Sequence, residues 1–163
     1  MPRIDKDNYY LDIAQTVLER STCIRRMYGA IIVRNDEIVS SGYNGAPRGR
    51  ANCVDLGYCI REKLHIPSGE RYELCRSVHA EANAIISAAR KETLGGTLYL
   101  VGRDAHTGKL HPRAECCPMC KRLVINAGIE RVVVRITEET YTVTPVQQWI
   151  DEDDSVRDEN YVL

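Results

Sequence analysis

The chain has 163 residues, of which 44% are hydrophobic and 28% are charged, a balance typical of one globular domain. Its 22 basic and 23 acidic residues give a net charge of −1, which argues against a general attraction to nucleic acid or to an anionic membrane. No run approaches the roughly 20 apolar residues of a membrane span. The N-terminal residues 1–7 are polar and lack the apolar region of a signal peptide. We therefore expect one cytoplasmic domain over residues 1–163.

The first half of the chain predicts one helix and a hairpin. Apolar side chains recur on one face of residues 8–20, which indicates an amphipathic helix. Two strands are expected at 29–34 and 37–43, because β-branched runs flank a turn at Asn35-Asp36. The segment 44–75 is irregular and rich in Gly and Pro. A loop of this length inside a compact domain is usually functional, and a bound metal would order it.

The second half alternates helices with short apolar strands. We expect an Ala-rich helix at 79–91, a strand at 97–101 and a polar loop at 102–115. A helix at 117–127, a strand at 131–136 and a short helix at 145–150 should follow. Such alternation indicates an α/β sandwich whose sheet is covered on both faces. The acidic run from about residue 151 is expected to be a solvated tail.

The seven cysteines need an explanation other than disulfides if the compartment is reducing. Metal ligation is the leading explanation, and buried inert thiols are the alternative. Two polar motifs, His79-Ala80-Glu81 and Cys117-Pro118-Met119-Cys120, each stand at the start of a predicted helix.

Catalytic zinc takes three protein ligands and leaves a fourth position for water. His79, Cys117 and Cys120 supply one imidazole and two thiolates, and the two-residue gap lets both sulfurs reach one ion. Glu81 is not needed as a ligand, and a carboxylate beside such an ion can carry protons. Together the motifs form the H-x-E and C-x-x-C signature of zinc nucleobase deaminases. A structural zinc, or a redox-type C-x-x-C beside an unrelated His, is the alternative.

One position departs from that signature. The residue before the first cysteine is Cys116, where the signature has Pro. Cys116 with Cys120 is therefore an alternative ligand pair, although the C-x-x-C spacing favours Cys117.

A second motif, Ser-Gly-Tyr-Asn-Gly-Ala-Pro-Arg-Gly at 41–49, precedes the His79 motif. With it, the chain resembles the deoxycytidylate (dCMP) deaminase family of the cytidine deaminase superfamily, from about Tyr9 to Ile136. The resemblance implies a three-layer α/β/α sandwich of the cytidine deaminase type, with a mixed sheet of about five strands. It also implies zinc-dependent hydrolysis of dCMP to dUMP with release of ammonia, a homo-oligomer, often a hexamer, and allosteric control by dCTP and dTTP.

The substrate contacts expected from this resemblance lie before the zinc motifs. Asn44 resembles the residue that holds the substrate at the pocket wall, and an amide can both donate and accept hydrogen bonds. The alternative is a turn residue that tolerates unusual backbone angles. Ala80, beside His79, is a further expected substrate contact. Arg25, Arg26 and Arg48 are candidates for the substrate phosphate, since guanidinium groups suit phosphate.

One feature departs from the compact family pattern, and another has parallels within the family. The insert 102–115, just before the zinc cysteines, either contacts substrate or is a surface loop without a role. Some members of the family carry a second, structural zinc, and here four early cysteines would make a closed site, namely Cys23, Cys53, Cys59 and Cys75. The alternative is four separate buried thiols.

Other functions compete with dCMP deamination. The substrate is alternatively CMP, cytidine, a modified pyrimidine or a base in RNA, although near-neutral charge and 6% aromatic residues disfavour RNA. A catalytically silent, zinc-bearing nucleotide sensor and a structural zinc-binding interaction protein belong to different classes. An intact Glu81 argues against both, because a pure binder needs no proton carrier.

Overall fold

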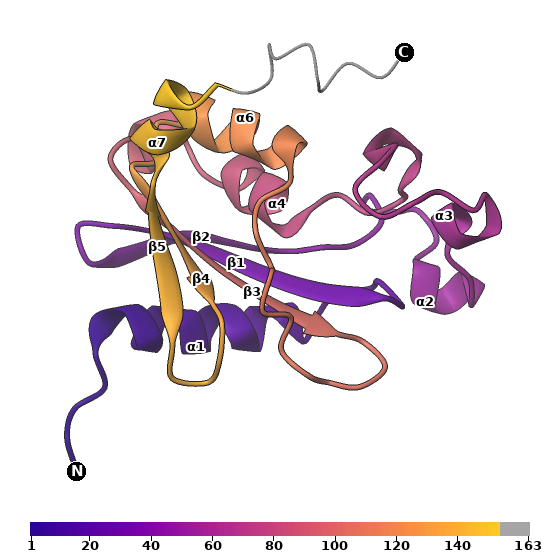
Figure 1. Cartoon of the computed structure of the whole chain (residues 1–163), viewed down its shortest axis with the longest axis horizontal. Coiled ribbons are helices and arrows are strands. Elements are labelled where there is room, and N and C mark those ends of the chain that lie inside the picture. Colours follow the sequence, from indigo (N-terminus) through magenta and orange to yellow (C-terminus); the bar gives the residue numbers. More distant parts are fainter. Residues whose placement is uncertain (154–163) are drawn as a thin grey trace.

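The computed structural model describes residues 1–153 and has one mixed sheet between two layers of helices (Figure 1). The strand order is β2-β1-β3-β4-β5. Strand β1 (Arg26–Arg34) pairs antiparallel with β2 (Glu37–Tyr43) and, on its other side, with β3 (Thr97–Asp104). Strand β3 runs parallel to β4 (Arg131–Arg135), and β5 (Tyr141–Pro145) forms the edge antiparallel to β4. The predicted five-stranded mixed sheet is confirmed.

Helix α1 (Lys6–Leu18) covers one face of the sheet (Figure 1). Its buried side chains, which include Leu11 and Leu18, pack against apolar residues of the central strands. Gly29 of β1 allows this close packing, because a Cβ there would lie 2.1 Å from the main-chain oxygen of Ala14. The helix is therefore seated directly on the backbone of β1.

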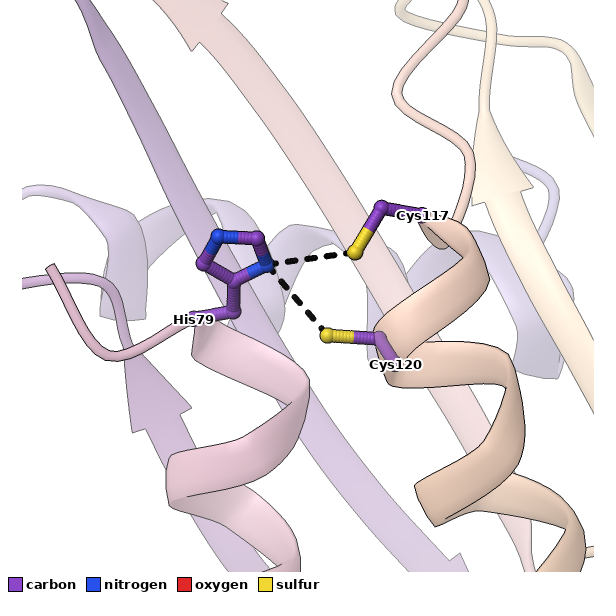
Figure 2. A group of neighbouring side chains, drawn as sticks. All are labelled: His79, Cys117 and Cys120. Carbon is purple, nitrogen blue, oxygen red and sulfur yellow. Dashed lines mark hydrogen bonds between the residues drawn. The ribbon is translucent and has the colours of Figure 1, made fainter. Parts of the chain in front are cut away.

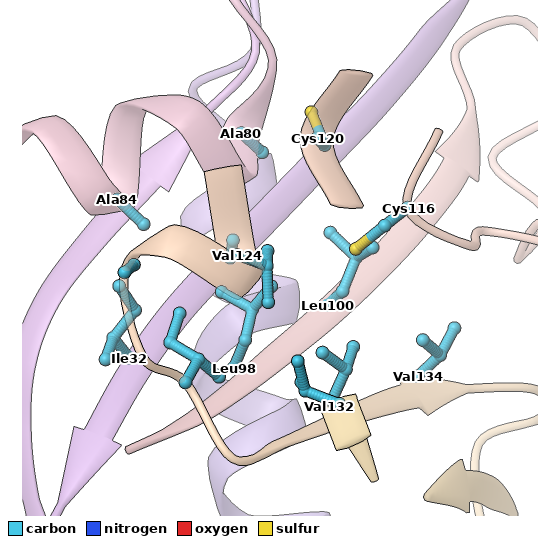
Figure 3. Packing of buried hydrophobic residues seen from close by; sticks show 14 of the residues in the cluster. Ile32, Ala80, Ala84, Leu98, Leu100, Cys116, Cys120, Val124, Val132 and Val134 are labelled. Carbon is cyan, nitrogen blue, oxygen red and sulfur yellow. The ribbon is translucent and has the colours of Figure 1, made fainter. Parts of the chain in front are cut away.

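The other face carries α4 (Ala80–Ile86), α6 (Pro118–Asn126) and α7 (Val146–Asp151), with the short α5 (Arg90–Thr93) beside them (Figure 1). The core under these helices consists of aliphatic side chains from the strands and small residues from α4 and α6 (Figure 3). At Gly42 of β2 a Cβ would lie 2.4 Å from the oxygen of Ala80. Close packing against the sheet thus fixes where α4 begins.

The segment 44–75 is more regular than expected. It contains α2 (Cys53–Leu56), α3 (Ile60–Lys63) and a 3-10 turn, η1 (Tyr72–Leu74). Arg61 ties the segment together, because its Nη2 donates to the main-chain oxygens of Pro67 at 2.8 Å and Glu70 at 2.6 Å.

The continuous helix predicted over 79–91 is wrong. Helix α4 ends at Ile86, and α5 is a separate turn that starts after Ala89. The Glu92 side chain accepts a hydrogen bond from the Ala89 main-chain nitrogen at 3.0 Å, and the Thr93 hydroxyl donates to the oxygen of Ala127 at 2.6 Å. These contacts outweigh the helix propensity of the alanines.

Two other elements differ from the prediction. Strand β5 was not predicted, because its side chains are exposed or half-buried at the sheet edge and show no apolar run. Strand β1 begins at Arg26 rather than Gly29. The predicted acidic tail falls almost wholly outside the described residues. Within residues 1–153, none of the helices combines the length and the apolar character needed to cross a membrane.

Candidate active site

Three side chains meet at the starts of α4 and α6, on the face of the sheet that these two helices cover. His79 is the N-cap residue of α4, Cys117 is that of α6, and Cys120 lies in the first turn of α6. The His79 Nδ1 lies 3.5 Å from the Cys117 Sγ and 3.3 Å from the Cys120 Sγ (Figure 2). The three candidate ligand atoms all lie within 4.8 Å of one another. One nitrogen and two sulfurs at this spacing fit a tetrahedral zinc ion, with bonds of about 2.0–2.3 Å and a fourth position left open.

The backbone explains why these groups meet. The crossover between the parallel strands β3 and β4 brings the start of α6 to the site. Pro118 stands at the first turn of α6, where its fixed φ suits a helix and its missing N–H costs nothing. Cys117 is extended, with φ −67° and ψ 163°, so its side chain leaves the helix toward His79 (Figure 2).

The three groups share hydrogen bonds that favour a thiolate. The pKa of the Cys117 thiol is lowered, first because of the hydrogen bond with Cys120 and then because of the one with His79. The pKa of His79 is raised, mainly by its hydrogen bond with Cys117. Metal ligands must be deprotonated thiols and neutral imidazoles, so a bound cation would replace the shared protons.

Glu81 lies beside this cluster and is only 5% exposed. Burial raises the pKa of its carboxyl above the ordinary value. The Cys116 thiol is hydrogen-bonded to the same carboxyl and is itself buried in the core. Cys117, not Cys116, is therefore the thiol that meets His79 and Cys120 in the structure.

A cavity opens next to the cluster, and its wall also includes His79, Glu81 and Cys117. The other lining residues come from the segment before β1, from β1, from the 44–75 segment and from the loops before α4 and α6. They include Arg25, Arg26, Tyr28, Asn44, Arg61, Tyr72 and Glu115. The candidate metal ligands thus stand at the wall of a pocket that also carries cationic, aromatic and amide groups.

Asn44 lines the cavity, but most of its amide is used within the protein. Its Oδ1 accepts from the Ser21 hydroxyl at 2.5 Å and from the Tyr28 main-chain nitrogen at 2.8 Å. Its Nδ2 donates to the Arg26 oxygen at 2.8 Å, which leaves one N–H for a ligand.

The other predicted substrate contacts divide into two groups. Arg25 and Arg26 line the cavity. Ala80 is fully buried in the core, and Arg48 is exposed, and neither belongs to the cavity wall. Their roles in substrate binding stay predictions.

Sequence reasoning missed several side chains of the wall, among them Tyr28, Arg61 and Tyr72. Arg61 and Tyr72 lie in the irregular segment, and Tyr28 lies in β1. The Tyr72 ring stands edge-on to the His79 ring, with centroids 5.3 Å apart. No motif singles these residues out, since isolated Arg and Tyr residues are common on surfaces.

The four early cysteines share one neighbourhood. Cys23, Cys59 and Cys75 line the cavity. The pKa of the Cys53 thiol is raised, mainly by burial and further by the thiols of those three cysteines. Within residues 1–153, however, the group of His79, Cys117 and Cys120 alone has ligand atoms at a spacing that fits one ion.

The insert 102–115 is not a loop throughout, because its first three residues belong to β3, which extends to Asp104. An ordered turn follows the strand. The Asp104 carboxylate accepts hydrogen bonds from the main-chain nitrogens of His106 and Thr107. The His111 ring lies 6.5 Å from the Tyr28 ring, and Glu115 reaches the cavity wall. The insert therefore approaches the cavity at its end nearest Cys117.

Residues 4–136 match the family described as the cytidine and deoxycytidylate deaminase zinc-binding region. The deoxycytidylate deaminase of Mycobacterium phage D29 is 37% identical over 138 residues, which cover 82% of this chain and 96% of that protein. The deoxycytidylate deaminase of Schizosaccharomyces pombe is 32% identical over 78% of this chain, but this covers only 36% of the yeast protein.

Solved structures show the same architecture. The apo crystal structure of dCMP deaminase from the cyanophage S-TIM5 superposes with a TM-score of 0.56 at 25% identity, and the match covers 82% of this chain and 85% of that chain. A mutant cytidine deaminase from Mycobacterium tuberculosis matches with a TM-score of 0.50 at 16% identity, over 92% of this chain and 98% of that chain, which is a likeness of fold alone.

Proposed function

Because the chain belongs to the cytidine and deoxycytidylate deaminase zinc-binding family, we propose that it hydrolyses dCMP to dUMP and ammonia with one catalytic zinc ion. The observation that carries the proposal is the cluster of His79, Cys117 and Cys120 beside the buried Glu81 at a cavity wall. The 37% identity to the phage D29 enzyme, over nearly all of that protein, favours dCMP among cytosine nucleotides.

His79, Cys117 and Cys120 would hold the zinc, which when bound acts as a Lewis acid that lowers the pKa of water toward neutral. Glu81 takes the proton from the attacking water as the oxygen adds to C4 of the cytosine ring. The same carboxyl delivers this proton to N3. It then takes the proton of the new C4 hydroxyl and passes it to the amine, so that the C–N bond breaks, the C4 carbonyl forms and ammonia leaves. A pKa raised by burial suits a group that must both accept and return protons.

The first test is the substitution Glu81→Gln. We expect zinc content to stay at the wild-type level, while kcat for dCMP falls by at least about 10²-fold, because the amide cannot shuttle protons. Ammonia release and metal analysis measure the two outcomes. A Glu81→Gln protein that deaminates dCMP at the wild-type rate would contradict the mechanism.

The substrate is tested by ammonia release from dCMP, CMP, deoxycytidine and dCTP. We expect dCMP to have the highest kcat/KM. A higher kcat/KM for another of these compounds would identify that compound, rather than dCMP, as the substrate. Saturable nucleotide binding without ammonia release would instead support the zinc-bearing sensor. Repeating the assay with dCTP or dTTP tests the allosteric control that the family resemblance implies.

We further propose a second, structural zinc bound by Cys23, Cys53, Cys59 and Cys75. The support is that Cys23, Cys59 and Cys75 line one cavity and that their thiols are near Cys53. The four sulfurs would have to move closer together to hold one ion. A closed four-thiolate site would order the segment that forms one wall of the cavity. Metal analysis should then find two zinc ions per wild-type chain and one in Cys53→Ser. One ion in both proteins would rule out the second site.

The assembly proposed is a cytoplasmic homo-oligomer, with a hexamer favoured. Exposed apolar side chains on the outer helical layer support self-association, since Ile86 of α4 is 74% exposed and Leu123 of α6 is 41% exposed. Light scattering coupled to gel filtration gives the mass. A monomer at micromolar concentration would contradict this proposal.

A further inference from the structure

Arg61 is a buried cation that has no paired carboxylate. Its side chain is buried, with 6% of the residue exposed. No ion pair within residues 1–153 joins it to an acidic side chain. Burying a charge without a counter-charge is costly, so such a group usually serves a purpose other than stability.

The neighbours of Arg61 fix its position without neutralising its charge. Its Nη2 donates to the main-chain oxygens of Pro67 and Glu70, and its Nε is buried with no hydrogen-bond partner. The guanidinium carbon lies 4.6 Å from the centre of the Tyr72 ring. The group is therefore ordered in advance, with its charge still available to an anion.

Two acidic residues close to Arg61 in the chain pair with other arginines. Glu62, the next residue in the chain, pairs with Arg25 at 2.9 Å. Glu73 pairs with Arg71 on the surface. These pairs distinguish Arg61 from Arg25, which lines the same cavity but already has its carboxylate.

The position of Arg61 in the cavity suits a ligand that has an anionic group at some distance from the part that reacts. Tyr72 contacts the Arg61 guanidinium with its ring face and the His79 ring in an edge-on geometry. The Tyr72 ring thus lies between Arg61 and the candidate metal ligand His79, and all three residues line the same cavity. A base bound at Glu81 would leave the rest of a nucleotide to extend along this wall.

We propose that Arg61 is a specificity-determining residue that binds the 5′-phosphate of the nucleotide, and this inference rests on the proposed function. The phosphate is the counter-charge that the folded chain does not provide. A guanidinium suits it because its planar set of N–H groups can donate paired hydrogen bonds to phosphate oxygens. Since the side chain is already ordered, little conformational entropy is lost when the phosphate binds.

The test compares wild type with Arg61→Gln and Arg61→Lys in the zinc-loaded protein. In Arg61→Gln we expect the KM for dCMP to rise by about 30-fold or more, because a hydrogen-bonded charge pair is lost, while kcat changes much less. Arg61→Lys keeps the charge and should recover part of the affinity. The matched control is Arg50→Gln, which removes an exposed arginine of the same segment that does not line the cavity.

Inhibition by inorganic phosphate distinguishes a phosphate-binding role of Arg61 from a role in supporting the 44–75 segment alone. Inorganic phosphate should inhibit the wild type and Arg50→Gln in competition with dCMP, and Arg61→Gln should lose most of this inhibition. Undiminished phosphate inhibition in Arg61→Gln, or a loss that appears in kcat with KM unchanged, would overturn the proposal.

Calorimetric titration with inorganic phosphate separates this inference from the proposed function, because it requires no turnover. Weaker phosphate binding by Arg61→Gln than by wild type would support the anion site even if dCMP were not the substrate. Equal binding by the two proteins would refute it. A wild-type protein that binds phosphate but does not deaminate dCMP would contradict the proposed function and leave Arg61 as an anion-binding residue.

Discussion

Two adjacent cysteines before α6 have different surroundings. The Cys117 sulfur turns toward His79, whereas Cys116 points into the core and contacts the Glu81 carboxyl. The difference arises because the chain is extended at Cys117, so successive side chains lie on opposite sides. Adjacent positions with the same residue type can thus have separate roles.

We expect Cys117→Ala to contain one zinc fewer per chain than wild type, and Cys116→Ala to keep the wild-type content. The reason is that Cys117 alone of the two belongs to the cluster with His79 and Cys120. Metal analysis of the purified proteins measures both. Loss of zinc from Cys116→Ala with retention in Cys117→Ala would reverse the ligand assignment.

The chemistry of the candidate site was predictable from the sequence because the motif residues are close together in the chain. His79 and Glu81 are two residues apart, and Cys117 and Cys120 are three apart, so spacing alone suggests their roles. Arg61 and Tyr72 could not be found in this way. They reach the cavity only through the path of the 44–75 segment, which tertiary contacts determine.

At the scale of elements, buried strands were predictable and edges were not. Strands β1, β3 and β4 are β-branched or apolar runs, which indicate burial on both faces. Strand β5 lies at an edge and owes its conformation to pairing with β4. The break between α4 and α5 likewise depends on contacts between distant residues, which helix propensity does not describe.

The seating of α4 on β2 can be tested with Gly42→Ala. A Cβ at this position would lie 2.4 Å from both the Ala80 oxygen and the Ala84 nitrogen, so the helix has to move. We expect the free energy of unfolding to fall by about 1–3 kcal/mol or more. Activity should also fall, because His79 is the N-cap of α4 and Glu81 lies in its first turn. Urea denaturation and ammonia release measure the two effects.

Ser41→Ala is the matched control, because Ser41 is exposed on the same strand. Its stability and activity should match wild type. A Gly42→Ala protein that is as stable and active as Ser41→Ala would show that α4 is not held by this contact.

The break after α4 predicts a second stability effect. In Thr93→Val the Ala127 oxygen loses the buried hydroxyl that donates to it at 2.6 Å. We expect the free energy of unfolding to fall by about 1–3 kcal/mol, with zinc content unchanged. Thr142→Val, at an exposed position of β5, is the control and should be nearly neutral in urea denaturation. Equal stability of the two variants would contradict the role of this hydrogen bond.

At the scale of the whole molecule, the sheet separates two hydrophobic clusters. One lies under α1, and the other lies under α4 and α6 (Figures 1 and 3). The candidate metal ligands belong to the second layer only, so α1 contributes to stability from the opposite face of the sheet. A domain of this size can bury most of its apolar surface without a metal.

Removal of zinc by a chelator should therefore leave the chain folded. We expect the far-ultraviolet circular dichroism spectrum to persist, while Tm falls, because a ligand that binds the native state stabilises it. Activity should disappear and return when zinc is added. Loss of the helical spectrum on chelation would show instead that folding depends on the metal, as in small zinc domains.

The metal ligands also have a consequence for the topology of the chain. His79 and Cys117 are 38 residues apart, so an ion bound by both closes a loop that contains α4, α5, β3 and the insert 102–115. The entropy of closing such a loop grows only with the logarithm of its length, and each doubling costs about 0.6 kcal/mol. A longer insert therefore adds little to the cost of the cross-link, and the segment before Cys117 is free to change in length while the ion continues to join the two helix starts.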